Sequence, residues 1–230
     1  MSEGELKRLE NINSDYYMMV SQEISTSLNG IVGALNLIKN HEHSASMKDL
    51  VESLDSSVSR LEKFTFKFML SNQLNLNLYK IKLTDIILKD LIHYSILDFN
   101  EFTRKNNIKI KTDKLLDITL QFDEDLIFKS FNYVLENAIK FSPKNGTIEI
   151  KTKTSNNQII CSISDSGPGF SKESLVSLFQ SFPLYENNIS TKGLSLYLVR
   201  QIMELHHGAI SIYNKTDSGA CVDLIFNNEQ

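Results

Sequence analysis

The sequence SQEISTSLNGI, residues 21–31, contains the pattern from which the first part of the fold can be predicted. Apolar residues recur through it and on both sides of it in steps of three and four, at Tyr17, Val20, Ile24, Leu28, Ile31, Leu35 and Ile38. This spacing keeps one apolar stripe on one side of a helix and is typical of a helical-bundle seam. At about 100° per residue, Gln22, Glu23 and Thr26 lie away from that stripe, so we expect them to form a polar ledge facing solvent.

A second helix with the same spacing is predicted after a polar turn at residues 40–44. Its apolar residues are Met47, Leu50, Leu54, Val58, Leu61, Phe64 and Phe68. Two such helices bury only half of their apolar seam against each other, and a dimeric four-helix bundle would bury the rest. We therefore expect residues 1–76 to form a helical hairpin domain that makes the protein a homodimer.

Residues 77–230 are predicted to form a second domain in which helices and strands are mixed. We expect helices over 84–104, 123–141 and 193–206, and strands near 108–110, 118–120, 147–152, 158–164, 210–213 and 220–226. Because several of these strands form hairpins, they predict an α+β fold with a mixed sheet that helices cover on one face.

Composition excludes several classes of partner. The net charge of the 230 residues is −4, and no basic stripe typical of nucleic-acid binding is present. No apolar run approaches the about 20 residues of a membrane span, and the first ten residues are charged where a signal peptide is apolar. We therefore expect a cytoplasmic protein without direct membrane insertion, in which Cys161 and Cys221 are small core residues.

Three segments of the second domain carry residue types that suit a nucleotide. ENAIKF, residues 136–141, ends a helix with an amide and an ammonium group that suit Mg²⁺ and phosphate. DSGPGF, residues 165–170, follows a strand, and its glycines let the backbone approach a ligand closely. TKGLSL, residues 191–196, opens a helix whose free amide groups form an anion site. Taken singly, each pattern is also common in helices and turns without a ligand.

The order and spacing of Asn137, Asp165 and Gly193 resemble the ATP-binding domain shared by histidine kinases, gyrase-type ATPases and the related heat-shock chaperones. FQSF, residues 179–182, resembles the phenylalanine box of the kinases, and ELHHG, residues 204–208, resembles their Glu-Leu-His-Gly-Gly ending. SQEISTSLN in turn resembles the phosphoacceptor box of two-component sensor histidine kinases, Ser-His-Glu-(Ile/Leu)-Arg-Thr-Pro-Leu-Asn. The resemblance covers nearly the whole chain. It implies a dimeric hairpin followed by an α/β-sandwich ATP-binding domain.

The resemblance implies roles for the residues of the first two segments. Asn137 would bind Mg²⁺ together with ATP, and Lys140 would bind the phosphates. Asp165 would accept a hydrogen bond from the adenine amino group, with Gly167 and Gly169 lining the base pocket. Phosphoryl transfer relies on such positioning and charge neutralisation more than on covalent help.

The third segment departs in part from the kinase pattern Gly-Thr-Gly-Leu-Gly-Leu. Gly193 and Leu194 match it and would meet the phosphates. Thr191, Lys192 and Ser195 stand where the pattern has glycine, threonine and glycine. Lys192 can still neutralise phosphate, whereas Ser195 adds bulk where helix and lid pack closely.

The acceptor box differs from the family at its reactive position, where Gln22 stands in place of histidine. Ser25 and Ser27 also replace arginine and proline, and Tyr133 stands where kinases commonly have another asparagine. The lone pair of an amide nitrogen is delocalised into the carbonyl, so glutamine is no phosphoryl acceptor. We expect no autophosphorylation at residue 22.

Glu23 and Thr26 retain the Glu-x-x-Thr pairing of the family. In the family the acid assists phosphotransfer, and the threonine places water against the aspartyl phosphate of a response regulator. Phosphatase activity is one interpretation of this pair, and ordinary residues on an exposed helix are the other.

Three functions stay open on the sequence alone. The first is a signalling protein that binds ATP and Mg²⁺ and regulates a response-regulator receiver domain or a partner histidine kinase. The second is the catalytic core of a true sensor kinase whose acceptor has been mutated. The third is an adaptor that binds no nucleotide and serves for protein contact alone.

Overall fold

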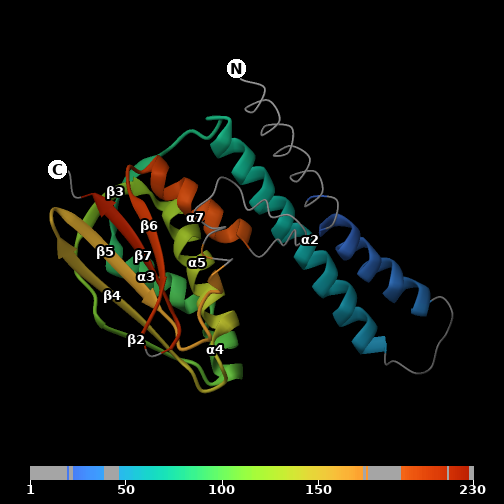
Figure 1. The fold of residues 1–230 in the computed structure, drawn as a ribbon. Coiled ribbons are helices and arrows are strands. Elements are labelled where there is room, and N and C mark those ends of the chain that lie inside the picture. The colour runs from blue at the N-terminus through green and yellow to red at the C-terminus, as the bar shows by residue number, and fades with distance from the viewer. Residues whose placement is uncertain are drawn as a thin grey trace. The chain divides into compact units, whose positions relative to one another are not determined.

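The computed structural model describes residues 20, 23–38, 47–172, 175, 193–216 and 218–227 (Figure 1). The described residues fall into two compact units. The first holds residues 20–72 with 193–194, and the second holds the remaining described residues from 73 onward. No helix in these described ranges is long and apolar enough to cross a membrane.

The first unit contains two antiparallel helices, residues 23–38 and α2 (Met47–Asn75). Glu23 bonds to Arg60, and Gly30 lies against Ser57, so the contacts run in opposite directions along the two helices. This arrangement confirms the predicted helical hairpin.

The first helix does not turn its apolar stripe toward α2. Its buried residues are Glu23, Ser27 and Ala34, whereas Ile24 and Leu28 are 37% and 46% exposed. Small side chains on the buried face let the helices approach closely, since a Cβ added at Gly30 would collide with the hydroxyl of Ser57. The helix α2 exposes apolar residues as well, namely Met47, Val51, Val58, Phe66 and Met69. A single chain therefore leaves apolar helix surface uncovered.

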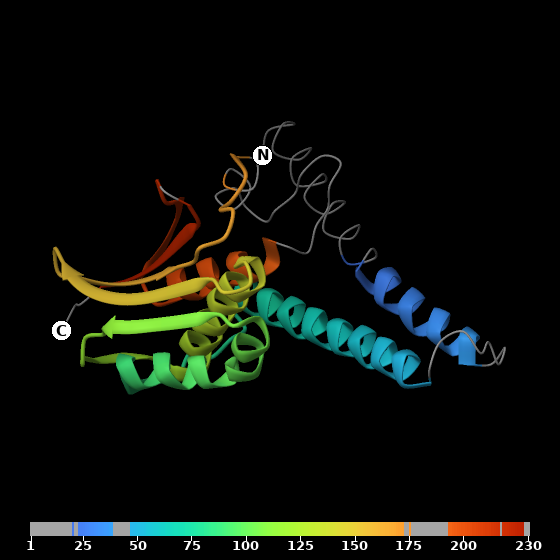
Figure 2. The same ribbon diagram turned by 90° about the horizontal axis from the view of Figure 1, so that it is seen from below.

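The second unit is built from a mixed sheet and the helices that cover it. Its elements are β1 (Leu83–Ile87), α3 (Leu88–Asp98), α4 (Asn100–Asn106), β2 (Lys109–Lys114), β3 (Thr119–Asp123), α5 (Glu124–Phe141), β4 (Thr147–Ser155), β5 (Gln158–Ser164), α7 (Leu194–Leu205), β6 (Ala209–Asn214) and β7 (Ala220–Asn227). The main sheet has the strand order β2-β4-β5-β7-β6, in which only the β2–β4 pair is parallel. Figure 2 shows α3 and α5 on one side of this sheet.

The core lies between the sheet and its helices. Along β5, Ile159, Cys161 and Ile163 are buried, while the residues between them are half-buried, as expected for a sheet with one face on the core. Phe131 and Leu135 of α5 are fully buried on the helix side. This layering confirms the predicted α+β fold with a mixed sheet covered on one face.

The predicted helix over residues 84–104 is wrong at its start and is interrupted near its end. Leu83–Ile87 is strand β1, which pairs antiparallel with β3. Pairing with a strand that lies far along the chain outweighs the weak local preference of this short apolar segment. The helix is also divided at Phe99, which ends α3 and precedes α4.

The helix α5 begins as predicted, and its N-cap explains why. The Asp123 carboxylate accepts a hydrogen bond from the backbone N–H of Leu126 at 3.1 Å. Glu124 and Asp125 follow in the first turn, where negative charge interacts favourably with the helix dipole.

Candidate functional site

The loop of residues 165–170, here called the Asp165 loop, packs directly on the C-terminal end of α5. A Cβ added at Gly167 would lie 2.5 Å from the carbonyl oxygen of Phe141, so only glycine allows this approach. The Ser166 hydroxyl also accepts the backbone N–H of Thr147 at 2.9 Å. The structure thus brings together the first two predicted segments, ENAIKF and DSGPGF.

Asp165 is positioned with one carboxylate oxygen committed and the other available. It is 9% exposed, and its Oδ1 accepts the backbone N–H of Gly167 at 2.8 Å and of Ala220 at 3.2 Å. Its Oδ2 accepts no hydrogen bond from the described residues. A carboxylate fixed in this way can accept a hydrogen bond from a ligand amino group without first reorganising.

On α5, Asn137 is half-buried and Lys140 is exposed, with its Nζ 5.5 Å from the ring centroid of Phe141. The amide oxygen of Asn137 is a ligand type that suits Mg²⁺. No group of three or more histidine, cysteine, aspartate or glutamate side chains that could hold a metal occurs in the described parts of the chain.

Tyr133, in place of the second asparagine, is a buried phenol. Burial, with a smaller effect from the nearby Glu136 carboxylate, raises the pKa of Tyr133 to about 12. The phenol is therefore neutral at physiological pH, and it brings no carboxamide oxygen to a metal.

The third segment is described only in part. Gly193 is half-buried and Leu194 is 2% exposed at the start of α7. Lys192, like Gln22 and residues 179–182, lies outside the described residues. The structure therefore places two of the three phosphate-segment residues predicted from the sequence.

The predicted exposure of Glu23 is wrong. Its side chain is 7% exposed, and Arg60 of α2 binds both carboxylate oxygens, with Nε 2.6 Å from Oε1 and Nη2 2.9 Å from Oε2. The helix turns its small residues toward α2, and Glu23 lies in line with them. Thr26 is exposed as expected.

Sequence reasoning missed the β6–β7 hairpin as a part of this site. The backbone of Ala220 both donates to Asp165 Oδ1 and accepts the backbone N–H of Asp165 at 3.0 Å. Gly219, with φ +90°, permits this contact because a Cβ there would collide with the Asp165 carbonyl oxygen. Its glycine indicates a turn in the sequence, but no local pattern reveals which loop the turn contacts.

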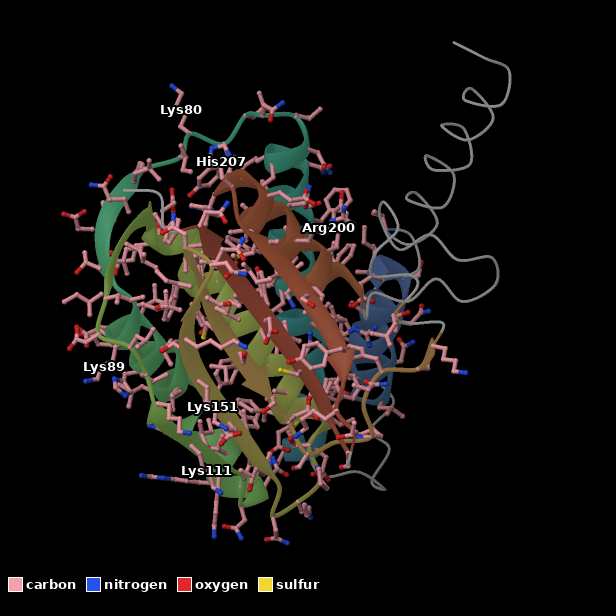
Figure 3. All side chains as sticks on the ribbon, turned by 60° about the vertical axis from the view of Figure 1, so that its left-hand side comes forward. Lys80, Lys89, Lys111, Lys151, Arg200 and His207 are labelled. Atoms are coloured by element: carbon pink, nitrogen blue, oxygen red, sulfur yellow. The ribbon has the colours of Figure 1, made fainter. Side chains whose placement is uncertain are left out.

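The ELHHG ending has a structural role. His206 Nε2 accepts the backbone N–H of Asp123 at 3.1 Å, and its Nδ1 lies 2.7 Å from the Ile202 carbonyl oxygen, to which it donates. Burial lowers the pKa of His206, which favours the neutral imidazole that these two bonds require. His207, labelled in Figure 3, has φ +56°, a conformation that glycine adopts more easily.

The comparisons with known proteins agree with this geometry. Residues 122–230 match the family described as histidine kinase-, DNA gyrase B- and HSP90-like ATPase. The heme sensor protein HssS of Staphylococcus saprophyticus is 27% identical over 221 residues, which cover 96% of this chain and 48% of HssS. The chain thus spans about half the length of this curated relative.

Solved structures share the fold of both units. The Acinetobacter baumannii histidine kinase AdeS superposes with a TM-score of 0.76 at 19% identity, covering 90% of this chain and 98% of that one. The histidine kinase ThkA, solved in complex with the response regulator TrrA, gives a TM-score of 0.71 at 22% identity, covering 99% of this chain and 66% of that one. Residues 122–230 thus match this ATPase family, and with the helical hairpin before them the similarities support a sensor histidine kinase catalytic core.

Proposed function

We propose that this chain binds ATP with Mg²⁺, does not phosphorylate itself, and acts as a dimeric signalling protein on a response-regulator receiver domain or a partner histidine kinase. The observation that carries nucleotide binding is the Asp165 carboxylate. Oδ1 is anchored by two backbone N–H groups, which leaves Oδ2 to accept the amino group of adenine. The ATPase-family match over residues 122–230 supports ATP as the ligand.

The phosphates and the metal are assigned to the two helix segments. Asn137 would contribute its amide oxygen to Mg²⁺, and Lys140, exposed on the last turn of α5, would approach the phosphates. Gly193 and Leu194 at the start of α7 would add backbone N–H groups, and Lys192 a positive charge. A bound Mg²⁺ ion would neutralise part of the phosphate charge.

The lack of self-phosphorylation rests on chemistry at position 22. A histidine acceptor needs a ring-nitrogen lone pair, and the carboxamide of Gln22 has none to offer. Glu23 supports the same conclusion, since both of its oxygens are bound by Arg60. A carboxylate paired in this way is a poor general base for a neighbouring acceptor.

The partner class is supported by the hairpin and by one relative. ThkA, which shares the fold, was solved with a response regulator bound. Thr26 is exposed on the hairpin, where a docked receiver domain could reach it. A phosphatase activity toward that domain would depend on Thr26 rather than on the ion-paired Glu23.

A homodimer is supported by the apolar surface of the hairpin. The exposed stripe of the first helix includes Ile24, Leu28 and Leu35, at 37% to 46% exposure. Contiguous apolar surface on paired helices favours association with a second helix pair.

A calorimetric titration with AMP-PNP and Mg²⁺ tests nucleotide binding. The unchanged chain should bind saturably, and Asp165→Asn should weaken binding at least about tenfold, which is about 1.4 kcal/mol. The asparagine keeps an oxygen for Gly167 and Ala220 but turns an NH₂ group toward the adenine amino group. The matched control Asp223→Asn changes a half-buried carboxylate of β7 and should leave the affinity unchanged. An unchanged chain without saturable binding would favour the nucleotide-free adaptor instead.

A further inference from the structure

Asn214, the last residue of β6, forms hydrogen bonds with Phe170 at the C-terminal end of the Asp165 loop. Its Oδ1 accepts the backbone N–H of Phe170 at 2.8 Å, and its Nδ2 donates to the Phe170 carbonyl oxygen at 2.8 Å. Both polar groups of one backbone residue are thus satisfied by one side chain, in the way that a neighbouring strand would satisfy them. This contact joins residues 44 positions apart in the sequence.

The two ends of the loop are attached to the same place on the β6–β7 hairpin. Asn214 is directly paired with Ala220 across the hairpin. Ala220 holds Asp165 at the start of the loop, and Asn214 holds Phe170 at its end. The two attachments differ, since Ala220 acts through its backbone and Asn214 through its side chain.

The contact between Asn214 and Phe170 also explains why the second glycine of the loop, Gly169, is needed. Gly169 has φ +80°, and a Cβ added there would lie 2.7 Å from Asn214 Oδ1. Any larger residue at position 169 would push the amide away from Phe170. Gly169 therefore makes room for the Asn214 side chain, beyond the base-lining role predicted from the sequence.

We infer that Asn214 is a positioning residue that holds the Asp165 loop in the shape that receives adenine. The inference rests on the proposed binding of ATP. With both ends of the loop fixed to one pair of hairpin residues, Asp165 and the glycine turn are pre-ordered before the ligand arrives. Binding then does not have to order the loop, and affinity is higher for that reason.

The test compares Asn214→Ala with a matched asparagine in the same sheet. Asn227, at the end of β7, also makes two side-chain bonds, accepting from Gln158 at 3.0 Å and donating to the His207 carbonyl oxygen. Titrations with ADP–Mg²⁺ and with AMP-PNP–Mg²⁺ are run at a temperature at which circular dichroism shows every variant to be folded. Asn214→Ala should lower the affinity for both ligands by the same factor of about ten, because the loop contacts the base that they share. Asn227→Ala should bind as the unchanged chain does.

A second measurement does not depend on the nucleotide. Amide hydrogen exchange at Phe170 should become faster in Asn214→Ala, while exchange in β5 and β7 stays as it was. Unaltered exchange at Phe170, unaltered affinity in Asn214→Ala, or equal weakening by both alanine variants would each overturn the role of Asn214. If the unchanged chain binds neither ligand, the proposed ATP binding is wrong and this role is wrong with it. The inference is supported if Asn214→Ala lowers nucleotide affinity while Asn227→Ala does not, and if amide exchange at Phe170 becomes faster in Asn214→Ala.

Discussion

Ser27 buries a hydroxyl group that the structure leaves unsatisfied. The side chain is 1% exposed on the face of the first helix that contacts α2, and its Oγ has no hydrogen-bond partner among the described residues. A buried hydroxyl without a partner loses its bonds to water and gains none in the fold. Ser27 therefore lowers the stability of the hairpin.

Replacing Ser27 with alanine should raise the free energy of unfolding. Chemical denaturation of Ser27→Ala and of Ser25→Ala separates the buried hydroxyl from helix propensity, because both changes gain the same propensity. Ser25 is exposed on the same helix. We expect Ser27→Ala to gain about 1 kcal/mol more than Ser25→Ala. Equal gains would mean that the Ser27 hydroxyl is satisfied.

The predictability of single residues depended on whether their partners were local. The place of Asp165 at the end of a strand and before a glycine turn could be predicted, because the strand and turn signals are contiguous in the sequence. The contact of Asn214 with Phe170 could not, because it joins two distant segments. Glu23 was predicted on the wrong side of its helix, because the apolar stripe suggested a seam that the single chain does not use.

An ion pair of unusual burial joins the two helices of the hairpin. Glu23 is 7% exposed at its side chain and Arg60 is 51% exposed, and the pair is bidentate. Removing the arginine would leave a buried carboxylate without a partner. The pair should therefore couple the helices more strongly than a surface pair would.

A double-mutant cycle with Glu23→Gln and Arg60→Gln should give a coupling free energy of about 2 kcal/mol in urea unfolding, between the values of exposed and buried pairs. The chain offers a control in Arg200 and Glu204 of α7, a more exposed pair at 2.7 Å and at i,i+4 spacing. We expect about 0.5 kcal/mol for that control. Similar coupling in the two cycles would show that burial of Glu23 adds nothing.

His206 links the end of α7 to the start of α5, and this link is sensitive to pH. Its Nε2 must be unprotonated to accept the backbone N–H of Asp123. Burial lowers the pKa of His206 in the folded protein below the unfolded value of about 6.5. The neutral ring therefore contributes its full stability above about pH 6.5, and this contribution is lost as the pH falls below that value.

Thermal unfolding of His206→Gln should depend less on acid than that of the unchanged chain. Between about pH 7.5 and about pH 5.5 the melting temperature of the unchanged chain should fall further than that of the variant. The reason is that His206 binds a proton more readily in the unfolded state than in the folded state. The same substitution at His93, an exposed residue of α3, is the matched control. An acid dependence that is identical in the two variants would contradict a buried neutral His206.

Helices and strands with strong local sequence signals could be predicted correctly, whereas an element with a weak signal could not. The helix α5 and the hairpin β4–β5 were both predicted close to their observed bounds, with polar turns marking the end of the helix and the turn of the hairpin. The strand β1 was not, because it is short and depends on pairing with β3, which starts 32 residues further along the chain. Tertiary pairing of this kind has no local signature.

The whole molecule is expected to be a dimer through the hairpin. Leu28 is 46% exposed on the apolar stripe, and we expect it to face a second copy. Leu28→Glu should convert dimer to monomer in sedimentation velocity, because a charge in the centre of an apolar interface loses its hydration. Asn36→Glu introduces the same charge at an exposed polar position of that helix and should remain dimeric. A Leu28→Glu variant that still sediments as a dimer would place the interface elsewhere.

In the proposed function, the chain is a histidine-kinase core that binds ATP and has no acceptor for its phosphate. Incubation with γ-labelled ATP and Mg²⁺ tests both parts, when label is counted on the chain before and after denaturation. We predict label bound to the native chain in equilibrium dialysis and none on the chain after denaturation, since Gln22 forms no phosphoryl bond. Label that survives denaturation would show self-phosphorylation, and a native chain without label would show that no ATP is bound. Either result would contradict the proposed function.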